Sequence, residues 1–302
     1  MSIDLSSYLR RIPALAHVDP SDCQRLGGLT NLNFLVHAAG ERFVLRIPGE
    51  GTDQYINRTH EEIAARSAAA VDVNVEVVFF DSTDGLMVTR FADAATTMTA
   101  ASFRDLSAVT RAARAFRELH DRATPFANDF TLFPMIDGYR RLLTDKGAAL
   151  PDGYDDVQKA AETVRDALEA HPVKLVASHC DPLCENFLDT GARMYLIDYE
   201  YAGNNDPMWD LGDLSVEADF DARQDEVLLS AYFGDHPPPQ HLGRMVAYKA
   251  LCDLLWTLWG VLQHVNDNPA DDFWSYAVGR FERCRTLMAT DGFQKAVSDI
   301  GG

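Results

Sequence analysis

Basic residues are scarce in this sequence relative to acidic ones. Lysine and arginine number 27 against 46 aspartates and glutamates, so the net charge is −19 at pH 7. Proteins that bind nucleic acid normally carry the opposite charge, and we therefore expect no nucleic-acid partner. The acidic residues are spread along the chain, which is typical of a solvated acidic surface. Such a surface could also favour the approach of a cationic substrate, and the sign of the charge does not decide between the two.

Long hydrophobic runs are also missing. No segment approaches 18 consecutive apolar residues, so we expect no membrane span. The apolar run Leu251–Leu262 is shorter and predicts a buried helix. The first 15 residues contain no long apolar core and no cleavage site, so we expect no signal peptide.

A regular pattern of cysteines is absent as well. The five cysteines are Cys23, Cys180, Cys184, Cys252 and Cys284, an odd number with irregular spacing. Cys180 and Cys184 lack a second pair of ligands, which argues against a zinc site. Reduced thiols in a cytoplasmic protein fit this pattern best.

The 302 residues are 47% apolar, which is enough for one large domain or two lobes. The first third is predicted to hold five strands, at Cys23–Leu29, Asn33–Ala38, Arg42–Ile47, Val75–Phe80 and Leu86–Phe91, and one helix, at Gln54–Ala70. Helical periodicity then dominates, in Ser102–Asp121, Phe130–Leu143 and Tyr154–Ala170, before a strand-rich stretch at Val173–Asp198 and further helices. We therefore predict an α+β chain with a small antiparallel-sheet lobe, residues 1–91, and a larger, mainly helical lobe, residues 92–302. A cleft between two such lobes is a common place for a ligand.

The residues with the clearest chemistry lie in the stretch Ser178–Glu200. Asp181 is followed five residues later by Asn186, and Asp198 ends the next predicted strand. Phosphoryl transfer needs an acceptor for the hydroxyl proton and Mg²⁺ ions to hold the phosphates. Asp181 would accept the proton, whereas Asn186 and Asp198, with help from Glu200, would ligate Mg²⁺ through hard oxygen atoms. Each residue alone could be an acidic loop residue, but their joint spacing favours catalysis.

This stretch resembles the catalytic loop and metal-binding strand of the choline/ethanolamine kinases and aminoglycoside phosphotransferases, which are small-molecule kinases with a protein-kinase-like fold. The longer run from Ile197 to Glu217 is similar to the bacterial choline kinases in particular, and the resemblance extends over Gly27–Phe281. It implies a two-lobe fold that uses ATP and Mg²⁺, with Asp210 bracing the catalytic loop. In this arrangement we expect His179 to hold the loop by hydrogen bonds and to take no part in the chemistry.

A glycine-containing turn lies between the first two predicted strands. Gly28 allows close approach of the backbone, and Thr30 and Asn31 offer hydrogen bonds to phosphate oxygens. An ordinary hairpin turn is the alternative interpretation.

The resemblance implies further nucleotide contacts. Arg46 stands where protein kinases have a lysine, and its forked guanidinium suits two phosphate oxygens, although a solvated cation at a strand end is the alternative. Glu61 or Glu62 would hold this arginine in an ion pair, and Glu61 fits the family pattern better. The segment Met87–Phe91, including Thr89, would be the hinge that contacts adenine, through its backbone more than its side chains.

Two tryptophans suggest what is phosphorylated. Trp256 and Trp259 are three residues apart on one face of a predicted helix. An aromatic stripe at this spacing is usually core, but two indoles could also bracket a quaternary ammonium, at about 0.5–2 kcal/mol each. The resemblance favours the second interpretation, because the choline-pocket helix of choline kinases is similar, and it adds Tyr201, Tyr276 and Glu217 to the pocket.

We therefore predict a kinase that phosphorylates the hydroxyl group of choline. Aromatic faces suit a permanent cation that cannot donate a hydrogen bond, whereas the primary ammonium of ethanolamine would need more acceptors. Ethanolamine, thiamine or an aminoglycoside are alternative acceptors, and a non-catalytic binder with the same fold is a further alternative. Leu183 stands where animal choline kinases have a polar residue, which bears on the choice of acceptor. The sequence leaves the oligomeric state open.

Overall fold

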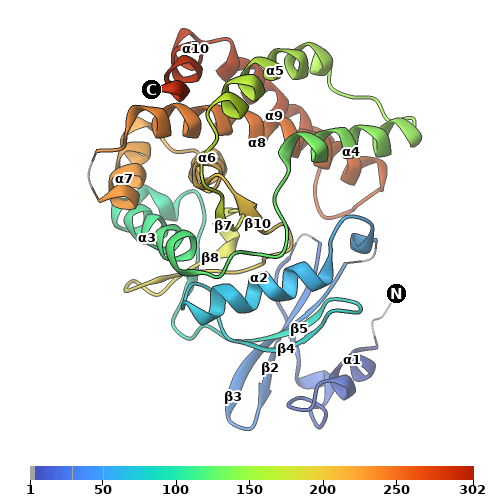
Figure 1. The fold of residues 1–302 in the computed structure, drawn as a ribbon. Coiled ribbons are helices and arrows are strands. Elements are labelled where there is room, and N and C mark those ends of the chain that lie inside the picture. The colour runs from blue at the N-terminus through green and yellow to red at the C-terminus, as the bar shows by residue number, and fades with distance from the viewer. Residues whose placement is uncertain (1–3, 29, 50, 235) are drawn as a thin grey trace.

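A five-stranded antiparallel sheet forms the N-terminal part of the protein (Figure 1). The structure is a computed structural model, and it describes residues 4–28, 30–49, 51–234 and 236–302. The strands are β1 (Gln24–Arg25), β2 (Leu32–Ala38), β3 (Glu41–Ile47), β4 (Val77–Asp81) and β5 (Leu86–Arg90), in the order β1-β2-β3-β5-β4. Ala39 and Gly40, both at positive φ, close the β2–β3 hairpin with a two-residue loop. In this register Arg46 of β3 lies between Asn33 of β2 and Met87 of β5.

Two helices pack against opposite faces of this sheet. The first, α1 (Leu5–Arg11), places Leu9 in a small core with the buried residues of β2 and β3. The second, α2 (Arg58–Ala70), buries a row of alanines in the larger core that the C-terminal helices share. The helix α2 begins later than the predicted residue 54. Its N-cap is Asn57, whose side chain accepts hydrogen bonds from the backbone amides of Thr59 and His60. The sequence did not predict α1, and β1 is shorter than expected.

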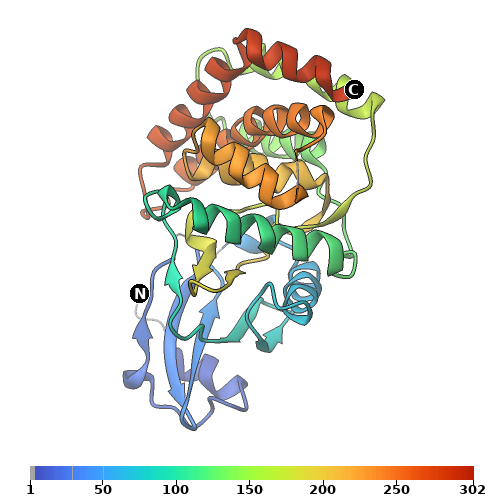
Figure 2. The same cartoon turned by 90° about the vertical axis from the view of Figure 1, so that its left-hand side faces the viewer.

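Helices make up most of the C-terminal part (Figures 1 and 2). They are α3 (Leu106–Arg122), α4 (Leu132–Asp145), α5 (Tyr154–Ala170), α6 (Pro207–Glu217), α7 (Ala222–Phe233), α8 (Pro239–Val265), α9 (Phe273–Met288) and α10 (Asp291–Ser298). The predicted helix at 102–121 is interrupted, because Asp105 caps α3 through the amide of Ser107 and the preceding turn is a separate 3₁₀ helix, Ser102–Arg104. The sheet-then-helix architecture confirms the predicted α+β fold.

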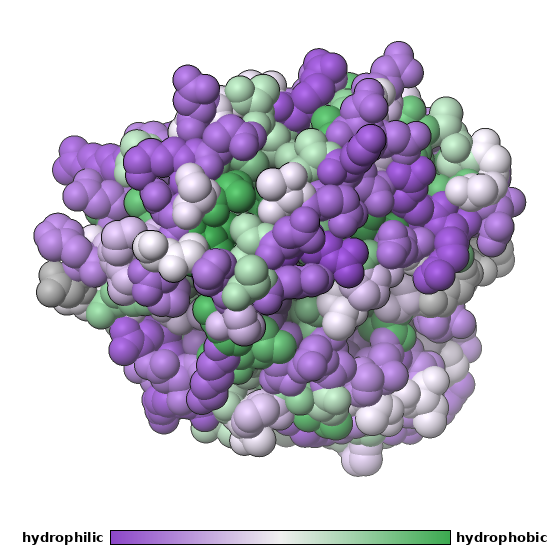
Figure 3. All heavy atoms as spheres, turned by 45° about the horizontal axis from the view of Figure 1, so that its top comes forward, coloured by the Kyte–Doolittle hydropathy of each residue, from purple (hydrophilic) through white to green (hydrophobic). Residues whose placement is uncertain are grey.

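The longest helix, α8, runs through the middle of this core. It is long and apolar enough to cross a membrane, but 89% of its most apolar window is buried inside the protein. It therefore serves as the central core helix, as predicted for Leu251–Leu262. Hydrophilic side chains cover most of the face shown in Figure 3, with hydrophobic ones in small separate groups.

Short strands between α5 and α6 shape the loops that face the sheet. They are β7 (Val176–Ser178), β8 (Phe187–Asp189), β9 (Met194–Leu196) and β10 (Gly203–Asn205). Strand β7 pairs with β10, whereas β8 pairs with both β9 and β6 (Thr96–Thr97). These pairings fix both ends of the loops at residues 179–186 and 197–202.

Candidate active site

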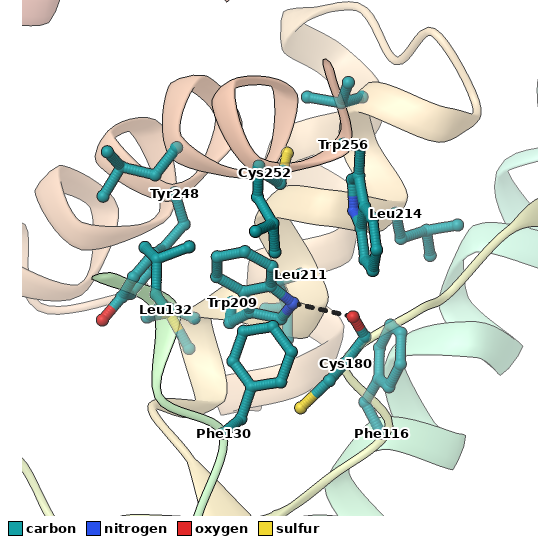
Figure 4. Close-up of a cluster of buried hydrophobic side chains, with 14 of the residues drawn as sticks. Phe116, Phe130, Leu132, Cys180, Trp209, Leu211, Leu214, Tyr248, Cys252 and Trp256 are labelled. Atoms are coloured by element: carbon teal, nitrogen blue, oxygen red, sulfur yellow. Dashed lines mark hydrogen bonds between the residues drawn. The ribbon is translucent and has the colours of Figure 1, made fainter. Parts of the chain in front are cut away.

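A fully buried aspartate holds the loop that carries Asp181. The Asp210 carboxylate on α6 accepts hydrogen bonds from the backbone amides of His179 and Cys180, both at 2.8 Å. It also contacts Nε2 of His120 at 3.0 Å, and the indole of Trp209 donates to the Cys180 carbonyl oxygen at 3.1 Å (Figure 4). Cys180 itself is at a positive φ of 67°, which a non-glycine residue adopts only when its surroundings enforce it.

The two loops are also tied to each other. The His179 ring contacts the Ile197 carbonyl oxygen through Nε2 at 2.9 Å, and the Asp181 amide approaches its Nδ1 at 3.4 Å. Donation from Nε2 and acceptance at Nδ1 require a neutral imidazole. Burial lowers the pKa of His179, which agrees with this form. The Asn186 side chain donates to the Asp181 carbonyl oxygen at 3.0 Å, which leaves its own amide oxygen as an acceptor.

Arg46 lies at the centre of a buried charge cluster. Its guanidinium pairs with Glu61 of α2, and it also contacts Asp198 at 2.9 Å and Glu200 at 3.6 Å. Arg58 bridges Glu61 and Glu200, each at 2.7 Å. The strand β3 and the helix α2 are thus bonded to the loop after β9. Glu62, the other candidate partner of Arg46, pairs with the exposed Arg66 instead.

The turn between β1 and β2 lies against the same cluster. The Asn31 side chain donates to Glu200 at 3.1 Å and accepts from the Gly49 amide at 3.1 Å. A Cβ atom on Gly28 would lie 2.5 Å from the Asn31 carbonyl oxygen, so the turn needs glycine there. At the hinge, the Phe91 amide donates to the Arg42 carbonyl oxygen at 3.0 Å, so only its carbonyl oxygen and ring could face a nucleotide base.

A cleft of about 870 Å³ connects these groups. The predicted residues that line it are Gly28, Thr30, Asn31, Arg46, Thr89, Phe91, Asp181, Asn186, Asp198, Glu200, Tyr201, Trp256, Trp259 and Tyr276. Glu61 and Glu217 are not among its lining residues. Nucleotide-site, metal-site and acceptor-site candidates therefore share one space between the sheet and the helices.

Aromatic rings gather at one end of this cleft. The rings of Tyr201 and Trp256 meet edge to face with centroids 5.2 Å apart, and those of Trp259 and Tyr276 lie 5.7 Å apart. Phe273 packs on Trp259 at 5.5 Å and also lines the cleft, although the sequence did not single it out.

Glu217, which was predicted to be the carboxylate of the acceptor pocket, does not line the cleft and contacts the aromatic rings only through another residue. It forms an ion pair with Arg280, whose guanidinium also covers the Tyr276 ring at 4.9 Å and contacts Asp253 at 3.1 Å. The resemblance gave no signal for Arg280. Asp213, also unpredicted, is fully buried and accepts from the Trp256 indole at 3.2 Å.

Burial shifts the ionisation of the two acids in the cleft. Burial, followed by the charges of Glu217 and Asp198, raises the pKa of Asp181 well above its usual range. Burial and Glu200 raise the pKa of Asp198 to about 7, while Arg46 opposes this rise. A nearby cation would stabilise the ionised form of either carboxyl group.

The donor set here fits a hard divalent cation. Carboxylate oxygens of Glu61, Asp198 and Glu200 lie within 4.8 Å of one another, and Asn186, which lines the same cleft, offers an amide oxygen as an additional neutral donor. Oxygen donors of this kind suit Mg²⁺. Glu61 does not line the cleft, whereas Asn186, Asp198 and Glu200 do, so these three are the better candidates.

The fold and the cleft are those of a small-molecule kinase, and comparison with known proteins agrees. Residues 22–248 match the phosphotransferase enzyme family, so the chain belongs to that family. A choline/ethanolamine kinase family protein from Mesorhizobium loti is 51% identical, with a TM-score of 0.88 over 98% of each chain. The choline kinase LicA from Streptococcus pneumoniae is 30% identical, with a TM-score of 0.77 over 88% of this chain and 92% of its own. A LicA structure in complex with AMP is 28% identical, with a TM-score of 0.74 over 88% and 91%.

These findings confirm the predicted membership of the choline/ethanolamine kinase group and the kinase-like fold. The protein is therefore an ATP-dependent phosphotransferase that acts on small-molecule alcohols.

Proposed function

We propose that the protein transfers the γ-phosphoryl group of ATP to the hydroxyl group of choline, giving phosphocholine and ADP. The observation that carries this proposal is the set of four rings, Tyr201, Trp256, Trp259 and Tyr276, in the same cleft as Asp181. A quaternary ammonium has no N–H to donate, and aromatic faces stabilise it without hydrogen bonds. The similarity to the choline kinase LicA from Streptococcus pneumoniae supports the same acceptor.

The residues divide between the two substrates. Asp181 accepts the proton of the choline hydroxyl as its oxygen attacks the γ-phosphorus and the bond to the β-phosphate oxygen breaks. Asn186, Asp198 and Glu200 would hold Mg²⁺, which when bound neutralises charge on the phosphates. Arg46, oriented by Glu61, would contact the phosphates, as would Gly28, Thr30 and Asn31, and the segment Met87–Phe91 with Thr89 would contact adenine.

Ethanolamine is the strongest alternative to choline as the phosphorylated alcohol. Its ammonium group would need hydrogen-bond acceptors among the four rings. Neither Glu217 nor Asp213 lines the cleft, and Glu217 pairs with Arg280 while one oxygen of Asp213 accepts from the Trp256 indole. We therefore rank choline first, followed by ethanolamine, thiamine and aminoglycosides.

The extent of the lobes and the location of the protein belong to the same proposal. We assign nucleotide binding mainly to residues 1–91 and acceptor binding and catalysis to residues 92–302. All five cysteines are free thiols, which supports a cytoplasmic location.

An acceptor panel tests the proposal. Choline, ethanolamine, thiamine and an aminoglycoside are each incubated with ATP and Mg²⁺, and ADP release and the phosphorylated product are measured. We expect the highest kcat/KM with choline. Asp181→Asn should lower kcat by orders of magnitude while nucleotide still binds, whereas Asp145→Asn, at an exposed position on α4, should leave kcat unchanged. Preference for another acceptor would refute the choline assignment, and unchanged turnover in Asp181→Asn would refute the role of Asp181.

A further inference from the structure

Tyr55, which precedes α2 and belongs to the sheet side of the cleft, reaches the aromatic end. Its ring stacks on that of Tyr201, with centroids 6.4 Å apart and planes 13° apart. Tyr201 in turn meets Trp256 edge to face, and all three rings line the cleft. The aromatic wall therefore contains one residue from the N-terminal part of the chain.

The hydroxyl end of Tyr55 points toward the helical part. Burial raises the pKa of Tyr55. The Gln263 side chain on α8 opposes this rise, because it is near enough to act as a hydrogen-bonding neighbour of the Tyr55 hydroxyl. The Gln263 Nε2 atom is buried and has no hydrogen-bond partner among the described residues. The tyrosine hydroxyl thus lies beside a buried donor that needs an acceptor.

The side chains of Thr52 and Arg58, which flank Tyr55 in the sequence, are bonded to the part of the cleft that holds the candidate metal ligands. The Thr52 hydroxyl donates to the Gly49 carbonyl oxygen at 2.8 Å and accepts from Arg58. Arg58 contacts Glu200 at 2.7 Å, and Glu200 also accepts from Asn31. A rearrangement of Glu200 would therefore reach Tyr55 through Arg58 and Thr52, whose carbonyl oxygen accepts from the Tyr55 amide.

We propose that Tyr55 is a positioning and specificity-determining residue for the cationic acceptor, and that it couples acceptor affinity to occupation of the nucleotide site. This inference rests on the proposed function. Coupling between two sites requires an element that both ligands contact or bias, and the segment Thr52–Arg58 contacts both ends of the cleft. Removing one ring from a cage that binds a quaternary ammonium should weaken choline binding by about 2- to 30-fold.

Calorimetric titration of choline tests both parts of the inference. The dissociation constant is measured with and without a non-hydrolysable ATP analogue and Mg²⁺, in wild type, Tyr55→Leu and Tyr55→Phe. In wild type we expect choline to bind more tightly when the nucleotide site is occupied. In Tyr55→Leu the choline affinity should fall, and so should the factor by which the nucleotide analogue tightens choline binding. Tyr55→Phe, which keeps the ring, should retain most of the affinity. Tyr195→Leu, on β9 and outside the cleft, is the matched control and should behave as wild type.

A neutral analogue separates a role in cation binding from a purely structural one. Dimethylbutanol, in which a tert-butyl group replaces the trimethylammonium group, has the shape of choline without its charge. In Tyr55→Leu the KM for this neutral alcohol should change much less than the KM for choline. The proposal would be overturned if the KM values for both alcohols rose equally in Tyr55→Leu. It would also be overturned if this variant matched wild type both in choline affinity and in the effect of the nucleotide analogue on that affinity. If the leucine variant does not fold, Tyr55→Met is judged by the same criteria.

The acceptor panel keeps this test separate from the proposed function. If wild type phosphorylates a different cationic alcohol, the choline assignment fails, and the titrations with that alcohol still decide the role of Tyr55. If choline is the substrate and Tyr55→Leu matches wild type, only the inference about Tyr55 fails.

Discussion

Replacing Asp210 with asparagine removes one charge and one acceptor at the most heavily bonded point of the catalytic loop. The carboxylate is fully buried; one oxygen accepts from Cys180, and the other faces His179 and His120. An asparagine has a single acceptor oxygen, so its amide group must face at least one of these donors. Hydrogen bonds to a charged group contribute about 1.5–3 kcal/mol each, and an orphaned buried donor costs about 1–3 kcal/mol. We therefore expect Asp210→Asn to lower the free energy of unfolding by about 3 kcal/mol.

Thermal unfolding and steady-state kinetics report this change. A loss of about 3 kcal/mol corresponds to a fall in Tm of roughly 5–10 °C for a chain of this size. Because a displacement of about 1 Å in a catalytic group can cost about 100-fold, kcat should fall by about 10- to 100-fold at temperatures where the variant is folded. Asp105→Asn makes the same chemical change at the exposed cap of α3, where asparagine caps equally well, and should leave Tm within about 1 °C. A variant of Asp210 with wild-type Tm and kcat would refute the bracing role.

Three further outcomes follow from the cleft. Arg46→Lys should raise the KM for ATP about 10-fold, because a lysine lacks the forked geometry that contacts several oxygens, and Glu61→Gln should raise it less. Gly49→Ala should raise the KM for ATP about 5-fold and lower Tm, because the added Cβ would overlap the Thr30 carbonyl oxygen and shift the turn. Burial lowers the pKa of His179 below 6.5, so its stabilising contribution is present above pH 6.5 and is lost as the pH falls through the lowered pKa. In urea unfolding, the stability gap between wild type and His179→Gln should therefore narrow from pH 7.5 to pH 5.5.

Control variants and contradicting results sharpen these tests. Arg66→Lys, in the exposed pair with Glu62, should leave the KM for ATP unchanged, and an equal effect of both arginine variants would contradict the role of Arg46. Gly138→Ala, inside α4, is the control for the glycine: apart from its own helix backbone, no described residue comes within 4 Å of the added Cβ, so it should stabilise the protein by about 0.5–1 kcal/mol. If the difference in free energy of unfolding between wild type and His179→Gln stayed constant with pH, the buried imidazole would not resist protonation.

Local signals made the N-terminal sheet largely predictable. Strand β2 and the first part of β3 alternate buried and more exposed residues around a two-residue turn, and the positions of both strands agree with prediction to within one residue. Strand β1 is shorter than predicted, because only Gln24 and Arg25 pair with β2. The start of α2 was misplaced since an N-cap at Asn57 competes with the helical period that precedes it.

The proximity of the candidate catalytic residues was predictable for a different reason. Asp181, Asn186 and Asp198 are close in the chain, and short strands bring them together with little freedom. Tyr55 is 146 residues from Tyr201, the ring on which it stacks, and the interval includes part of the N-terminal sheet and part of the helical region. No periodicity or spacing relates residues that only the packing of the two lobes brings together.

The position of Glu217 shows what a motif can and cannot identify. The resemblance implied that Glu217 is the carboxylate of the acceptor pocket, but its partner Arg280 lies 63 residues later, on α9. Once paired, the two charges stabilise each other in a buried setting, and the guanidinium packs against the Tyr276 ring that faces the cleft. Truncating either partner would leave the other charge buried and the ring without support. Glu217 thus supports one wall of the cleft through its ion pair with Arg280, and it does so without lining the cleft.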